Sequence, residues 1–145
     1  VRVLSAVTVM AKWSMDPDSW GRYGPVLHTM ASSDPAPICR AAAGFALVRM
    51  GEVSGLKTVI DQIPLLSDPG EVAECLAWLE ASIGSDARAE IDYGEFGPFI
   101  HMGEDPRLLR HAHEIAQLWL GWYTAHKDRL EYDVERSQWT LHVDQ

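Results

Sequence analysis

Residues 32–51 read SSDPAPICRAAAGFALVRMG, and after Pro37 this stretch contains almost only small or apolar side chains. On a helix with about 100° between successive residues, these side chains fall into two neighbouring stripes. The first stripe is Ile38, Ala41, Ala42, Phe45 and Val48, and the second is Cys39, Ala43, Ala46, Leu47 and Met50. A helix that docks on one core needs a single apolar face. Two stripes therefore predict a helix buried on both flanks, with Gly44 and the alanines allowing close approach of neighbouring backbones.

Asp-Pro pairs and glycines bracket three apolar stretches of this kind. The stretches begin at Asp34-Pro35, Asp68-Pro69 and Asp105-Pro106 and end at Gly51, Gly84 and Gly121. Asp is a good N-cap, Pro suits the first helical turn, and Gly after a helix adopts the left-handed conformation that ends it. The starts lie 34 and 37 residues apart, a period that predicts stacked helical repeats.

The rest of the chain predicts further helices and one hairpin. Second helices are expected at 56–66 and, more weakly because of Gly94, Gly97 and Pro98, at 85–102. A helical hairpin is expected at the N-terminus, with helices at 2–13 and 18–31, a turn at 16–18 and a kink at Pro25. Alternating residues in 129–133 and 138–142 predict a β-hairpin. The predicted fold is one all-α solenoid domain over 1–145, with repeats near 1–31, 34–66, 68–102 and 105–126 and a hairpin at 129–142.

The first stretch resembles the HEAT-like repeat of the phycobilisome-lyase type. The matching positions are Asp34, Pro35, Cys39, Arg40, Ala42, Ala43, Ala46, Leu47 and Gly51. The second stretch matches more loosely, with Ala73 and Glu74 where Arg is usual, and the third has His113 where Ala is expected. The resemblance covers residues 34–121. It implies a HEAT-like solenoid and says little about activity, because this family consists mostly of protein-binding scaffolds with a few enzymes.

The net charge of −9 lies in one segment of the chain. Residues 68–105 contain ten acidic side chains and a single basic one, Arg88. This charge argues against a nucleic-acid partner, since phosphate binding needs the opposite sign. No apolar run reaches the roughly 18 residues of a membrane span, and no signal peptide is expected. Cys39 and Cys75 lie among apolar neighbours in predicted helices, so we expect buried thiols and a cytoplasmic location.

Candidate chemistry is sparse, and we expect neither a catalytic, cofactor nor metal site. The His113-Glu114 pair is similar to the iron-binding pairs of the HEAT-like deoxyhypusine hydroxylases, but those need several pairs on successive repeats. The equivalent stretches here read Ala-Ala-Gly and Leu-Ala-Trp. His111 and His113 lie about 200° apart on a helix and cannot share a metal ion. The chain also lacks nucleophile-elbow, P-loop and dinucleotide motifs.

The acidic segment is the best functional candidate. Trp78 lies outside the apolar stripe of its helix, with Glu71 and Glu74 beside it. We expect this tryptophan to anchor a basic or amphipathic protein partner. The alternative is that it packs on the adjoining repeat and that the acids form only a solvated face. The proposed surface continues through four further acids, Asp86, Glu90, Asp92 and Glu95.

The function that this surface predicts is non-enzymatic binding of a basic protein. An inhibitor or immunity protein that neutralises a basic toxin would fit. Two alternatives stay open: an accessory lyase-like or chaperone-like protein handling a tetrapyrrole, as the resemblance implies, and a regulatory fragment of a longer protein. Trp119, Trp122, Tyr123 and Trp139 could form an aromatic box, but we expect them to cover the end of the solenoid against the hairpin, as Trp13 and Trp20 would at the other end.

Overall fold

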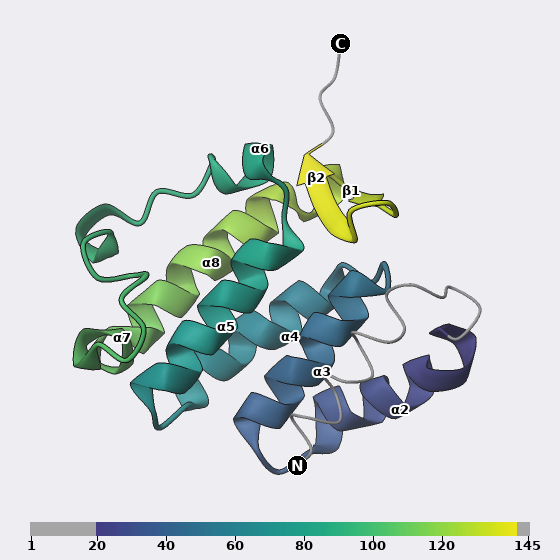
Figure 1. Ribbon diagram of the computed structural model, residues 1–145, viewed down its shortest axis with the longest axis horizontal. Helices are drawn as coiled ribbons and strands as arrows, with labels where there is room; N and C mark the ends of the chain where they lie inside the picture. The colour runs from purple at the N-terminus through teal and green to yellow at the C-terminus, as the bar shows by residue number, and fades with distance from the viewer. Residues whose placement is uncertain (1–19, 142–145) are drawn as a thin grey trace.

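The computed structural model describes residues 20–141, which form a mostly helical fold with a small C-terminal β-hairpin (Figure 1). The predicted helix at 2–13, the turn at 16–18 and Trp13 lie outside the described residues. The α-helices are α2 (Trp20–Ser33), α3 (Pro37–Arg49), α4 (Ser54–Gln62), α5 (Pro69–Ser82), α6 (Ser85–Arg88), α7 (Pro106–Arg110) and α8 (Ala112–His126). Short 3-10 turns occupy η2 (Ile63–Leu65), η3 (Gly94–Phe96) and η4 (Lys127–Arg129), and the strands are β1 (Leu130–Asp133) and β2 (Gln138–Leu141).

Helix α3 is buried on both flanks, as its two apolar stripes predict. Ala41, Ala42, Phe45 and Val48 belong to the main core. Ala43, Ala46, Leu47 and Met50 form a second cluster with Leu27 of α2. The small side chains of α3 therefore allow it to pack between α2 on one side and α4 and α5 on the other.

Two glycines bring the backbones of α3 and α4 into contact. A Cβ atom built on Gly55 would lie 2.3 Å from the Gly44 carbonyl oxygen, and one on Gly44 would lie 2.9 Å from the Thr58 side chain. Any larger residue at Gly55 would push the two helices apart. This confirms the close approach predicted for Gly44.

Two further packing contacts complete the helical core. Helix α5 packs on α3, and α8 packs on α4 and η2. In Figure 1, α3, α4, α5 and α8 lie as neighbouring helices across the body of the molecule, with α2 along the outer side of α3. Trp119, Trp122, Tyr123 and Trp139 are all buried in the main core.

The aspartate caps are confirmed at two of the three predicted positions. The Asp68 and Asp105 side chains accept hydrogen bonds from the backbone N–H groups of Gly70 and Arg107, each at 2.9 Å. The prediction for Asp34 is wrong, because α3 begins at Pro37 and its N-cap is Ala36. Asp34 instead lies at the end of α2, where its N–H donates to Met30 and its carboxylate accepts from the Ala36 N–H.

A left-handed glycine at a helix end, as predicted, is confirmed only for Gly51. It follows α3 with φ +94°, the left-handed conformation that lets the chain reverse. Gly84 also follows a helix, because α5 ends at Ser82, but it has φ −70° and is the N-cap of α6. Gly121 is exposed inside α8, which continues to His126, so its predicted role is wrong. A glycine in a helix weakens it without ending it when the following residues still pack on the core.

The second helix expected at 85–102 does not form. Only Ser85–Arg88 is helical, and the chain then runs through irregular structure with η3 to α7. Gly94 has φ +54°, a left-handed conformation that a continuous helix cannot contain. The third predicted helix is also divided, because α7 ends at Arg110 and α8 begins at Ala112.

The predicted β-hairpin is confirmed and docks on the ends of two helices. β1 and β2 pair antiparallel, with Tyr132 opposite Trp139. The Trp139 indole N–H donates to the Val48 carbonyl at 3.1 Å, and the Tyr132 hydroxyl donates to the Arg49 carbonyl. These bonds add donors to carbonyls at the C-terminal end of α3, where the Val48 carbonyl also accepts from the Gly51 N–H. The Trp139 carbonyl accepts from the Gly84 N–H just after α5.

Candidate functional site

Trp78 is a core residue in the structure. It is 7% exposed, and its ring stacks on Phe45 of α3 with centroids 5.5 Å apart and an interplanar angle of 17°. The expected role as an exposed anchor is therefore wrong. The tryptophan lies off the apolar stripe because α5 packs on more than one neighbour, so the side facing α3 also needs an apolar residue.

The glutamates beside Trp78 remain accessible at the start of α5. Glu71 is half-buried and Glu74 is exposed. Neither forms an ion pair among residues 20–141. Burial, and then the charges of Glu71 and Glu74, raises the pKa of the neighbouring Cys75 thiol. Cys75 therefore stays protonated, which disfavours a role as a nucleophile.

The other four predicted acids lie beyond the opposite end of α5. Asp86 is in the single turn of α6, and Glu90, Asp92 and Glu95 are in the irregular segment that follows. All four are exposed. Asp92 accepts a hydrogen bond from the Gly94 N–H, and none of the four forms an ion pair within the described part of the chain.

The structure thus divides the predicted acidic face into two groups. We call Glu71 and Glu74 the α5 group, and Asp86, Glu90, Asp92 and Glu95 the loop group. Glu71 points to the same side of α5 as Trp78, since the two are separated by about two turns. The loop group follows the C-terminal end of α5 and leads away from it, as the chain from α6 to α7 shows in Figure 1.

A side-chain cluster that no sequence pattern predicts joins α5 to the irregular segment. The Tyr93 hydroxyl donates to Glu80 Oε1 at 2.9 Å, and His101 Nε2 lies 2.7 Å from Oε1 and 3.0 Å from Oε2. The Tyr93 ring also meets the His101 ring edge to face, at 5.9 Å between centroids. No spacing signal indicates this cluster, because its members come from a helix and from two points of a segment without periodicity.

The environment of this cluster differs between its inner and outer sides. Burial, and then the negative charge of Glu80, raises the pKa of the Tyr93 phenol above its ordinary value. Tyr93 therefore remains a hydrogen-bond donor to the Glu80 carboxylate. The Glu80 side chain is 21% exposed and that of His101 is 64% exposed. The imidazole is thus the solvent-facing partner of a partly buried carboxylate.

A pocket of about 240 Å³ opens beside Glu80. It lies between α5 and the end of the irregular segment, and its lining is Ala73, Leu76, Ala77, Glu80, Ile100, His101 and Gly103. Ala73, Ala77 and Glu80 lie on one face of α5, because they are spaced by four and three residues. The pocket is therefore an apolar slot with a carboxylate at one end.

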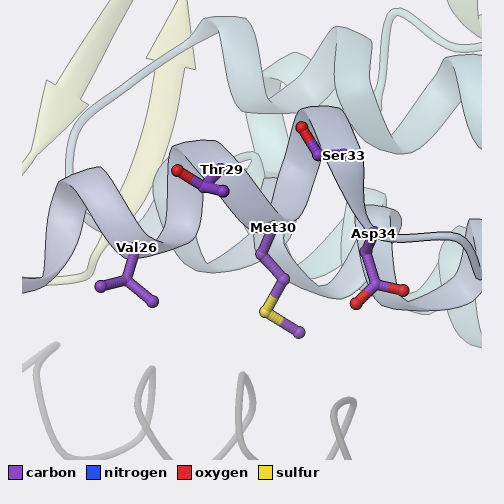
Figure 2. Close-up of a pocket in the computed structure, with 5 residues that line it drawn as sticks. All are labelled: Val26, Thr29, Met30, Ser33 and Asp34. Carbon is purple, nitrogen blue, oxygen red and sulfur yellow. The ribbon is translucent and has the colours of Figure 1, made fainter.

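A second pocket, of about 420 Å³, lies along α2 and carries little chemistry. Figure 2 shows Val26, Thr29, Met30, Ser33 and Asp34, which line it from α2 and its end. The only ionisable group among these five is Asp34, which is buried and accepts a hydrogen bond from Ala36. Among the described residues that line this pocket, the surface is mostly apolar and Asp34 is the single charged group.

The histidines considered for a metal site do not gather with other ligands. His113 and Glu114 are exposed on α8, whereas the His111 ring lies 5.6 Å from that of Phe96 and 5.8 Å from that of Phe99. Among residues 20–141, no group of three His, Cys, Asp or Glu side chains is placed to hold a metal ion.

We compared the chain with protein-family models, curated proteins and solved structures. The chain matches no protein-family model, no curated protein and no solved structure. Within the described residues, no helix is long and apolar enough to span a membrane.

Proposed function

We propose that this protein is a non-enzymatic binding module whose acidic segment, residues 68–105, engages a basic protein. The observation that carries the proposal is the lack of neutralising partners. Of the ten acidic side chains in this segment, only Asp105 pairs with an arginine among the described residues, and Glu80 faces His101. A surface with one sign of charge attracts an oppositely charged partner and accelerates its association.

We also propose that the helices form a HEAT-like stack that presents this surface. The packing of α5 on α3 and of α8 on α4 supports it, because these contacts add one further helix beside each member of the α3–α4 pair. In this arrangement α8 takes the place of the second helix that 85–102 fails to form. The irregular segment then becomes an insertion, and insertions on one face of a repeat protein commonly serve binding.

Charge reversal in matched pairs tests the proposed function. The variants are Glu71→Lys/Glu74→Lys in the α5 group and Glu90→Lys/Glu95→Lys in the loop group. Glu114→Lys/Glu135→Lys is the control, since it changes the net charge equally with exposed acids outside the segment. Partners captured on the immobilised chain are purified, and their affinity for each variant is measured by calorimetry.

We expect at least one of the two test pairs to weaken binding about tenfold or more, while the control pair retains most of the affinity. Circular dichroism verifies that all variants fold. Equal losses in the test and control pairs would show that the location of the charge does not matter, and no loss in either test pair would contradict the proposal.

A further inference from the structure

The pocket beside Glu80 has the size and lining of a site for one side chain. Its volume of about 240 Å³ is below the roughly 300–1,000 Å³ of typical small-molecule sites. Its walls are apolar, with Ala73 and Ala77 on one side and Ile100 on the other. An occupant would therefore need a narrow apolar stem and a polar head that reaches the carboxylate.

Glu80 is prepared to receive a cation at that end. Its inner donor, Tyr93, is a neutral hydroxyl that positions the carboxylate without cancelling its charge. Its outer donor, His101, is largely exposed and belongs to the irregular segment between α6 and α7. No lysine or arginine of the described chain pairs with Glu80. A strongly basic group could thus replace His101 without displacing Tyr93.

We infer that this pocket receives one lysine or arginine side chain of the basic partner, with its methylene stem against Ala73 and Ala77 and its cation on Glu80. This inference rests on the proposed function and specifies where the partner is anchored. Lysine and arginine bury their stems along apolar surface while the charged head stays on a polar group. A cation on a partly buried carboxylate forms a charge-assisted bond that is stronger than a neutral one.

The surroundings of the pocket favour a basic protein over a free amine. Glu104 follows the lining residue Gly103, and its carboxylate lies beside Gly70, one turn before Ala73. The slot therefore has carboxylates near both ends, and the α5 and loop groups continue the negative charge beyond it. A chain with several basic residues would satisfy this extended surface, whereas a single amine would reach only Glu80.

Two substitutions in the pocket and one matched control test the inference. Ala77→Leu fills the slot from an exposed position, and Glu80→Gln keeps an acceptor for Tyr93 while removing the charge. Ala81→Leu is the control, because Ala81 is also an exposed alanine of α5 but does not line the pocket. The probe is a fluorescein-labelled octalysine peptide, measured by fluorescence anisotropy at low salt with the full chain.

We expect Ala77→Leu and Glu80→Gln each to weaken octalysine binding about tenfold, while Ala81→Leu binds like the wild type. Thermal unfolding confirms that each variant is folded. Wild-type affinity for octalysine in all three variants would overturn the pocket as the anchor. An equal loss of affinity in Ala77→Leu and Ala81→Leu would overturn it as well.

The outcomes separate this inference from the proposed function. If the pocket variants bind normally while a charge-reversal pair does not, the acidic surface stands and the pocket fails. If the charge-reversal pairs also bind normally, the proposed function itself is contradicted.

Discussion

Gly44 and Gly55 place the backbones of α3 and α4 in direct contact, with the Gly44 carbonyl oxygen only 2.3 Å from where a Cβ of Gly55 would lie. The two helices can approach this closely only because neither residue has a side chain. The small residues of the stretch 32–51 predict close packing of this helix, and the contact between Gly44 and Gly55 is where that packing is tightest.

Gly55→Ala should lower the free energy of unfolding by about 1–3 kcal/mol, because its Cβ meets backbone that cannot move aside freely. Gly121→Ala is the matched control, since it lies in α8 with open space around it. That change should stabilise the protein by about 0.5–1 kcal/mol. Urea unfolding followed by circular dichroism measures both. A stable Gly55→Ala variant would show that the contact is looser than described.

Trp78→Ala should lower the free energy of unfolding by about 3–5 kcal/mol, because it removes a buried ring that stacks on Phe45. The exposed neighbour Glu74 provides the control, and Glu74→Ala should change stability by no more than about 0.5 kcal/mol. Chemical denaturation compares the two. A Trp78→Ala variant as stable as the wild type would contradict the burial of Trp78 in the core.

Tyr132→Phe should lower the free energy of unfolding by about 1 kcal/mol, because it leaves the Arg49 carbonyl at the end of α3 without its hydroxyl donor. Trp139→Phe should cost more, since it removes the bond to Val48 and also buried volume. Val134, exposed in the hairpin turn, gives the control Val134→Ala. Thermal unfolding checks all three. Equal stability of Tyr132→Phe and Val134→Ala would mean that the hydroxyl contributes nothing to docking.

The raised pKa of Tyr93 predicts a loss of stability at alkaline pH. The unfolded chain releases this proton near the ordinary tyrosine pKa of 10.0, whereas the folded protein retains it. The native state then binds more protons than the unfolded state, so stability falls as the pH rises above about 10. Tyr93→Phe should reduce this fall. Urea unfolding between pH 8 and about 11 compares the two proteins, and identical pH profiles would contradict the buried, Glu80-bound phenol.

The sequence predicts those features that depend on dense local patterns. The two stripes of α3, the caps at Asp68 and Asp105 and the alternating hairpin strands each lie within a few residues. Patterns of this kind are repeated at every turn of a helix or every second residue of a strand. A prediction from such a pattern therefore stays correct when one or two residues do not fit it, and the structure confirms these predictions.

The candidate site depends on packing between distant segments, which a local pattern does not encode. Tyr93 and His101 lie 13 and 21 residues after Glu80, in a segment that the helical period fails to describe. The role of Trp78 was wrong for the same reason: a helical wheel shows one stripe but not how many neighbours the helix has. Gly121 looks like a helix end in sequence, but the packing of Trp122 and Tyr123 carries α8 past it.

Mapping the interface by amide NMR tests the central claim most directly. The isotope-labelled chain is titrated with a purified basic partner, and the shifted amides are assigned along the chain. We expect the largest shifts to fall between Glu71 and Glu104, including the α5 group, the loop group and the pocket beside Glu80. Shifts confined to α2, α8 or the hairpin, with none in this segment, would contradict it.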